Sequence, residues 1–160
     1  MPTFSPGSWF VLERWIADSP YRFAAQPGQS DLDVARGSHA KEVLEHHWDS
    51  WVIEQDFAWI AARGLNTVRL PVRQIAVFVG RSCLETSLLR QIGYYHLCGA
   101  DPSVLKGTDF EGLEHIYAGA WSRITTAIAT ANKFGLGVLL GELPDPCRLR
   151  LLEPVVLSTI

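Results

Sequence analysis

The chain has 160 residues, of which 48% are hydrophobic and 19% charged, and it carries a net charge of −3. This composition is that of a globular domain with its own core, and it excludes an intrinsically disordered chain. The weak negative charge offers no attraction to nucleic acid or anionic membranes, so we expect neither partner.

The first part of the chain predicts a strand, a loop and a short helix. The apolar run within residues 7–13 predicts a short buried strand. Residues 19–36 are rich in Pro, Gly, Gln, Ser and Asp and predict an exposed loop. Ser38 is the predicted N-cap of the helix that follows.

A second helix and a second strand are predicted next. The helix covers residues 51–63 and ends at Gly64, which suits the position after a helix C-terminus. Residues 66–70 then predict a strand stopped by Pro71. At helical spacing, the residues expected to be buried in this helix are Ile53, Phe57, Ile60 and Ala61.

The second half of the chain begins irregularly. Residues 72–91 follow neither a helical nor a strand period, and residues 92–111 predict a long loop. A long helix is predicted over residues 113–134, closed by Gly135, and a third strand over residues 136–140. The inner face of this helix is expected to consist of Ile116, Ala120, Ile124, Ile128 and Ala131.

Strands that alternate with helices predict an α/β fold with parallel strands. A dinucleotide-binding sheet is the rival architecture, but no G-x-G-x-x-G motif follows the first predicted strand.

Three motifs together resemble one family of enzymes. They are GSWFVLE at residues 7–13, HWDSWVIEQDF at 47–57 and GLNTVRLP at 64–71. This combination is similar to the N-terminal third of fungal exo-β-1,3-glucanases, which are retaining glycosidases of glycoside hydrolase family 5. The resemblance resumes over residues 92–140, and within it residues 95–140 are similar to the intracellular-type branch. It implies a (β/α)8 barrel of which only the first three βα units are present, because such a barrel needs roughly 250 residues.

Two segments depart from the family pattern. In that family the Pro71 position is followed directly by a segment like Ile92–Tyr95, so residues 72–91 are interpreted as an insertion within a domain spanning 1–140. Residues 141–160 form a divergent tail where relatives continue with an Asp-Leu-His run. We expect both segments to be translated intron.

The resemblance also implies which chemistry is missing and which remains. The two catalytic carboxylates of the family lie on its fourth and seventh strands, one of them in an Asn-Glu-Pro motif that this sequence lacks. We therefore expect no catalytic residue and no hydrolysis. Three substrate-binding residues are implied: Glu13 for the hydroxyls of a terminal glucose, Arg69 beside the nucleophile and Tyr94 near the pocket mouth. The expected partner is a β-glucan or a glucose-containing oligosaccharide.

Other functions are less well supported by the residues. His39, Glu42 and His47 do not form the H-E-x-x-H pattern, so we expect no metal site and no cofactor. Three irregularly spaced cysteines and the absence of a visible signal peptide predict a cytoplasmic protein. A non-enzymatic glucan-binding remnant and a small interaction domain remain as alternatives. The six tryptophans fit either core packing or sugar stacking.

Overall fold

The structure, a computed structural model, describes residues 2–71, 106 and 109–141. Its centre is a sheet of three parallel strands in the order β1 (Thr3–Phe4), β2 (Thr67–Pro71) and β3 (Gly137–Gly141). Thr3 pairs with Thr67, and β2 pairs with β3 from Thr67–Gly137 to Pro71–Gly141. The predicted α/β fold with parallel strands is confirmed for this part of the chain.

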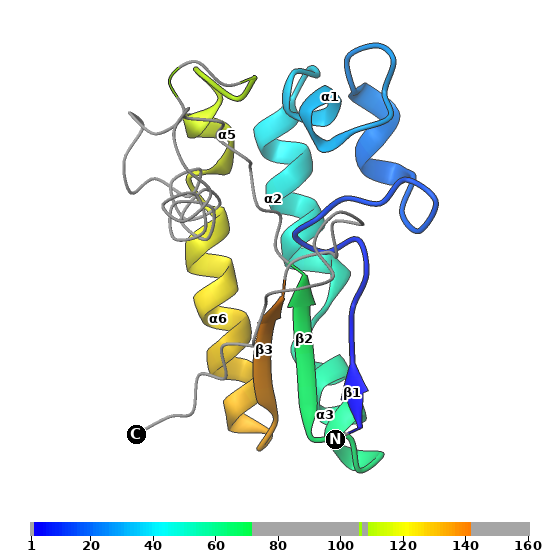
Figure 1. The fold of residues 1–160 in the computed structure, drawn as a ribbon, viewed down its shortest axis with the longest axis vertical. Helices are drawn as coiled ribbons and strands as arrows, with labels where there is room; N and C mark the ends of the chain where they lie inside the picture. The colour runs from blue at the N-terminus through cyan, green and yellow to red at the C-terminus, as the bar shows by residue number, and fades with distance from the viewer. Residues whose placement is uncertain (1, 72–105, 107–108, 142–160) are drawn as a thin grey trace, which may run out of the picture.

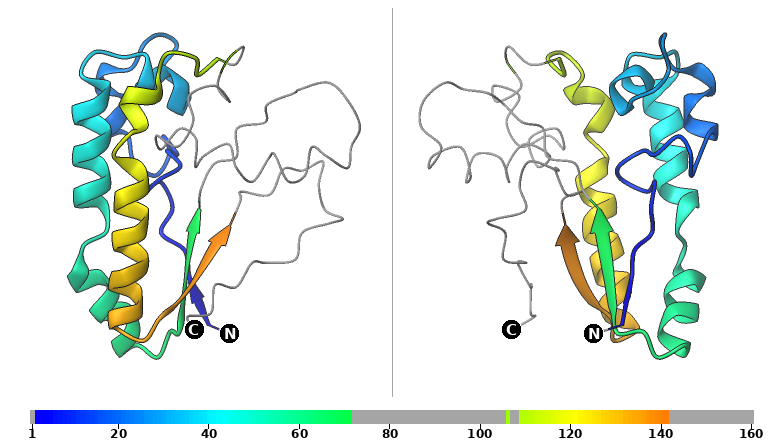
Figure 2. Two further views of the ribbon diagram at one scale, coloured as in Figure 1. Left: turned by 90° about the vertical axis from the view of Figure 1, so that its left-hand side faces the viewer. Right: turned by 45° about the vertical axis from the view of Figure 1, so that its right-hand side comes forward.

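The main helices cover one face of the sheet (Figure 1; Figure 2, left). They are α2 (Ala40–Trp51), α3 (Glu54–Ala62) and α6 (Ala120–Lys133), and both α2 and α3 contact α6. Three shorter helices, η1 (Ser19–Phe23), α1 (Asp31–Ala35) and α5 (Glu114–Tyr117), lie toward the end at which the strands finish (Figure 1).

The core lies between this helical layer and the sheet. Alternate strand residues Val68 and Leu70 are each 1% exposed and belong to the same apolar cluster as the inner faces of the helices. Because successive strand side chains point to opposite faces, Arg69 points to the face away from the helices. The helical members of the cluster include Leu44, Trp48, Phe57, Ile60, Ile124 and Ala131.

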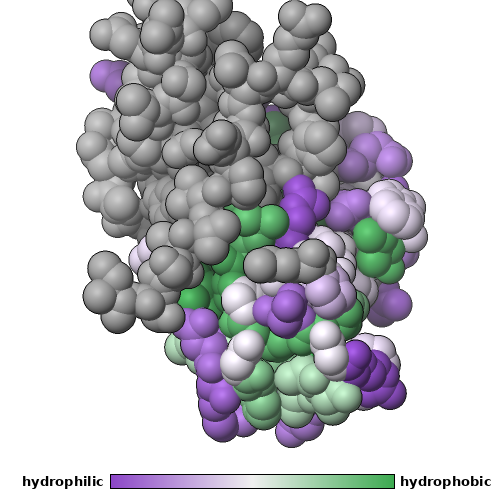
Figure 3. Space-filling view, turned by 60° about the horizontal axis from the view of Figure 1, so that its bottom comes forward, coloured by the Kyte–Doolittle hydropathy of each residue, from purple (hydrophilic) through white to green (hydrophobic). Residues whose placement is uncertain are grey.

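Hydrophobic side chains also reach the surface. Viewed from the bottom of Figure 1, hydrophobic residues are interspersed with hydrophilic ones (Figure 3). The most exposed of the large ones are Trp15, Phe23 and Trp59. In the part of the chain that the structure describes, no helix is long and apolar enough to cross a membrane.

The predicted strand over residues 7–13 is wrong. The first strand is Thr3–Phe4, and the apolar run that follows it forms turns and bends. Ser8 adopts a left-handed conformation with φ of 58°, which ends any extended run. The residues are nevertheless buried as expected, and Val11 is 0% exposed.

One loop prediction and one helix-cap prediction in the first half also need correction. Residues 19–36 are not one loop, because η1 and α1 form within them. Ser38 does not cap the next helix: its N-cap is the left-handed His39, which makes no side-chain capping bond.

The later helices differ at their starts. The helix expected from residue 51 begins at Glu54, because the Ile53 amide donates to Asp56 Oδ2 at 2.9 Å and starts α3 there. Ile53 is 45% exposed and not buried. The single helix expected over residues 113–134 is two helices, α5 and α6, separated at Ala118–Gly119.

The two predicted helix stops are confirmed. Gly64 and Gly135 have φ of 74° and 71°, a left-handed region in which glycine avoids the steric cost of a Cβ. The second and third strands begin and end one residue later than predicted. Gly141 ends β3 opposite Pro71 and is the first residue of the expected divergent tail 141–160. The expected insertion 72–91, Tyr94 and the three cysteines lie outside the described residues, as do residues 142–160.

Candidate functional site

Glu13 lies in the segment that follows β1, beyond the carboxyl end of the strand. Its carboxylate oxygen Oε1 accepts a hydrogen bond from the Ser8 amide at 3.3 Å. The Ser8 hydroxyl accepts from the Glu13 amide at 3.1 Å and donates to the Glu13 carbonyl oxygen at 3.4 Å. A fully buried serine therefore fixes both the backbone and the carboxylate of a half-buried glutamate.

Helix α2 holds the turn that contains Ser8. The Nε2 atom of buried His47 lies 2.5 Å from the Ser8 carbonyl oxygen, and Trp51 Nε1 donates to the Gly7 carbonyl oxygen at 2.7 Å. Trp9 Nε1 returns a hydrogen bond to the Trp48 carbonyl oxygen at 2.8 Å. Burial lowers the pKa of His47, with the bond to Ser8 opposing the shift and neighbouring His46 adding to it. His47 is thus neutral near pH 7 and donates from Nε2 to Ser8.

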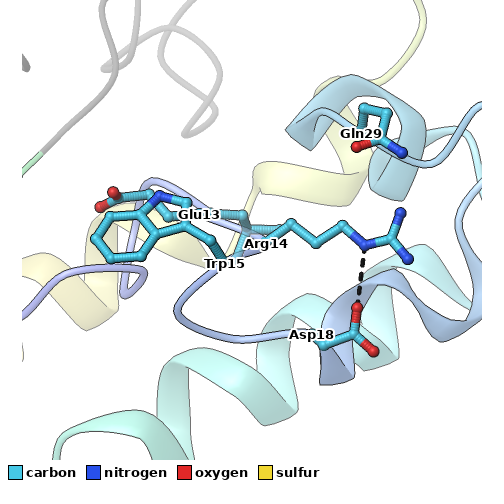
Figure 4. Close-up of a pocket in the computed structure, with 6 residues that line it drawn as sticks. Glu13, Arg14, Trp15, Asp18 and Gln29 are labelled. Atoms are coloured by element: carbon cyan, nitrogen blue, oxygen red, sulfur yellow. Dashed lines mark hydrogen bonds and ion pairs between the residues drawn. The ribbon is translucent and has the colours of Figure 1, made fainter.

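An open hollow of ≈ 540 Å³ lies beside Glu13 (Figure 4). Its lining residues are Leu12, Glu13, Arg14, Trp15, Asp18 and Gln29. The Glu13 carboxylate and the Trp15 indole lie at one side of it, and the Arg14 side chain runs the other way toward Asp18 (Figure 4). Trp15 is 83% exposed, so its ring is accessible from solvent in the described structure.

The opposite wall of the hollow is held by polar contacts. Arg14 Nε donates to Asp18 Oδ1 at 3.0 Å, and its Nη1 donates to the Gly28 carbonyl oxygen at 2.8 Å. The backbone N–H of Gln29 donates to Asp33 Oδ2 at 2.8 Å, and this contact is the main cause of the lowered pKa of Asp33. The hollow therefore combines an aromatic ring, two carboxylates, a guanidinium and an amide side chain, so its polar lining can both donate and accept hydrogen bonds.

The predicted site residues are not all brought together. Glu13 lines the hollow. Arg69 is the third residue of β2 and is half-buried, but it is not among the lining residues. Tyr94 lies outside the described residues. Within the described residues, no group of three or more His, Cys, Asp or Glu side chains could hold a metal ion.

Sequence reasoning missed Ser8, Trp15 and Gln29. Trp15 carried a usable signal, because a tryptophan two residues from a predicted sugar-binding carboxylate can stack on the same sugar. Ser8 carried none, since its role depends on a left-handed conformation and on His47, which is 39 residues away.

Comparison with known proteins confirms the resemblance that the motifs predicted. The chain is 29% identical over 141 residues to glucan 1,3-beta-glucosidase 3 of Schizosaccharomyces pombe, a match covering 84% of this chain and 25% of that protein. It is 45% identical over 74 residues to glucan 1,3-beta-glucosidase 2 of Wickerhamomyces anomalus, covering 41% of this chain and 17% of that protein. The chain thus spans a quarter or less of the length of these relatives.

Two further comparisons add little to this. No protein-family model matches the chain. The crystal structure of a rutinosidase from Aspergillus niger is 16% identical, with a TM-score of 0.38, over 85% of this chain and 46% of that structure. A similarity this low carries no weight in assigning the fold.

Proposed function

We propose that the described residues form the first three strand units of a (β/α)8 glycoside hydrolase similar to glucan 1,3-β-glucosidases, and that Glu13 binds a terminal glucose unit of a β-1,3-glucan. The observation that carries the proposal is the placement of Glu13. Its carboxylate is oriented by the Ser8 amide and borders an open hollow at the carboxyl end of a parallel sheet. In α/β barrels the substrate binds at that end of the strands.

The chemistry of the hollow supports the same ligand. A carboxylate held by one amide retains acceptor capacity for sugar hydroxyls, which are good donors. The exposed Trp15 ring offers an apolar face beside it, and sugars present C–H faces that pack on such rings. Arg69, on β2 of the same sheet, is proposed to act in the complete barrel and not in the Glu13 hollow.

The 160-residue chain is proposed to bind a β-1,3-glucan without hydrolysing it. A retaining glycosidase needs two carboxyl groups roughly 5 Å apart on either side of the scissile bond. The family resemblance assigns that pair to later strands, and the Asn-Glu-Pro motif of the acid/base residue does not occur in the sequence.

Calorimetric titration with laminaribiose, a β-1,3-linked glucose disaccharide, tests this function. We expect Glu13→Gln to weaken binding, because an amide replaces one acceptor oxygen with a donor. Glu42→Gln, at an exposed position in the first turn of α2, is the matched control and should bind like the unmodified chain. Equal binding by the two variants, or no binding by the unmodified chain, would refute the proposal. Release of glucose by the purified chain would refute its inactivity.

Residues 72–91 and 141–160 are proposed to be translated intron. Support comes from the family pattern, in which Pro71 is followed directly by a segment like that at Ile92. Sequencing the mature messenger RNA tests this. Reads that join the codons of Pro71 and Ile92 are expected, and a population in which every read retains the intervening codons would contradict it.

A further inference from the structure

We propose that His47 and Trp51 are positioning residues for the Glu13 carboxylate, acting through the left-handed turn at Ser8. The inference rests on the proposed function, since it assigns to helix α2 the task of orienting the group that binds sugar. The juxtaposition behind it is a continuous path of hydrogen bonds from α2 to the Glu13 carboxylate.

The first step of the path is the contact between α2 and the turn. His47 and Trp51 are four residues apart and therefore share one face of the helix. Their rings lie 5.0 Å apart between centroids, and they donate to the adjacent carbonyl oxygens of Ser8 and Gly7. Two neighbouring carbonyl groups are thus oriented by one rigid helix.

The second step is the conformation that these contacts hold. Ser8 has φ of 58°, a region that a residue with a Cβ rarely occupies unless its surroundings impose it. In this conformation the Ser8 carbonyl oxygen meets His47 while its amide meets Glu13 Oε1. A peptide that rotated toward the extended region would withdraw the amide from the carboxylate.

A purely structural role would look different. The hydrogen bond from Trp9 to the Trp48 carbonyl already attaches the segment to α2 without involving Ser8 or Glu13. His47 and Trp51 instead contact the two residues that come just before the Trp9 anchor, where the turn is left-handed. Their removal should therefore loosen the Glu13 carboxylate before it detaches the segment.

The test compares two substitutions of His47 in the 160-residue chain. Gln places an amide donor near the position of Nε2, whereas Met has a similar volume and no donor. We expect His47→Met to weaken laminaribiose binding by roughly 3- to 10-fold, the effect of one lost hydrogen bond, and His47→Gln to restore most of it. If the Met variant fails to fold, Trp51→Phe gives a second test in the same direction, because it keeps an aromatic ring but loses the pyrrole part of the indole together with its Nε1 donor.

Two further readouts separate positioning from general destabilisation. In a Glu13→Gln background, His47→Met should cause no additional loss of binding, although it should still lower the melting temperature. Hydrogen exchange at the Ser8 amide should accelerate in His47→Met and not in His47→Gln, and this measurement needs no sugar. Additive losses of binding, or unchanged Ser8 exchange in the Met variant, would overturn the inference. If exchange responds as expected while the unmodified chain binds no laminaribiose, the proposed function fails and the positioning of the carboxylate stands.

Discussion

Arg123 on α6 binds Asp49 on α2 through two hydrogen bonds, 2.6 Å from Nε to Oδ1 and 2.7 Å from Nη2 to Oδ2. The guanidinium also lies 3.8 Å from Glu45 Oε1 and 5.8 Å from the centre of the Trp48 ring. This ion pair joins two helices that are distant in the sequence but in contact within the helical layer. It thereby links the helix that precedes β3 to α2, the helix that contacts the Ser8 turn.

The first prediction concerns this ion pair. Asp49 is 56% exposed, so solvent screens the interaction, and we expect Asp49→Asn to lower the free energy of unfolding by about 0.5–1 kcal/mol at pH 7. Glu54→Gln, which removes the more exposed single contact with Lys133, should cost less. Urea unfolding of both variants at low salt measures the difference. A larger loss in the Glu54 variant would contradict the ranking.

The same pair predicts a dependence on pH. The hydrogen bond from Arg123 lowers the pKa of Asp49 below its usual 3.8. The unfolded chain therefore binds this proton first as the pH falls, so the stabilisation is complete above pH 3.8 and disappears as the pH drops through the folded pKa. The stability difference between the unmodified chain and Asp49→Asn should accordingly vanish in strong acid. A constant difference from pH 7 to pH 2 would show that the pair does not titrate in this way.

His47 is predicted to destabilise the fold as the pH falls. Burial lowers its pKa from 6.5, so the unfolded chain takes up the proton while the folded chain still excludes it. The free energy of unfolding must then decrease below about pH 6.5, until the folded pKa is reached. His47→Gln should flatten this part of the pH profile, and subtracting the two profiles removes the contribution of the remaining histidines. Parallel profiles would contradict the prediction.

Ser30 is predicted to stabilise the wall of the hollow that carries Gln29. Its hydroxyl accepts from the Asp33 amide at 3.3 Å, and Asp33 Oδ2 accepts from the Ser30 amide at 3.0 Å, which completes a capping box at the start of α1. Ser30→Ala should cost about 1 kcal/mol of unfolding free energy, and Ser30→Gly only a few tenths. Thermal melts of the two variants give the comparison, and a Gly variant weaker than the Ala variant would contradict it.

The features of this fold that the sequence predicts are those determined by residues close together in the chain. Gly64 and Gly135 were predictable because a glycine after an apolar helical pattern has few other uses. Strands 67–71 and 137–141 were predictable to within one residue, because each lies between such a stop and a further break. Both features depend only on residues close by in the chain.

The segment that carries Glu13 was harder to predict for the opposite reason. A run of large apolar residues reads equally well as a strand or as a buried irregular turn. Here the choice is made by His47 and Trp51, which hold Ser8 and Gly7 from about forty residues away. Glu13 was identified through a family motif, whereas the hollow beside it could be recognised only once the turn was seen.

The last prediction tests the aromatic side of the proposed sugar site. Trp15→Ala should weaken laminaribiose binding by about 1 kcal/mol, the scale of one aromatic packing contact beyond area burial, because the exposed ring borders the same hollow as Glu13. Trp59→Ala is the matched control: Trp59 is 50% exposed, but it packs under the Arg63 guanidinium on α3, away from the hollow. Both variants should remain folded, since neither ring belongs to the buried core. Quenching of tryptophan fluorescence by the disaccharide in the Trp59 variant, and its loss in the Trp15 variant, would identify the ring in contact with sugar. The reverse pattern would place binding on the outer helical surface and remove the hollow from consideration.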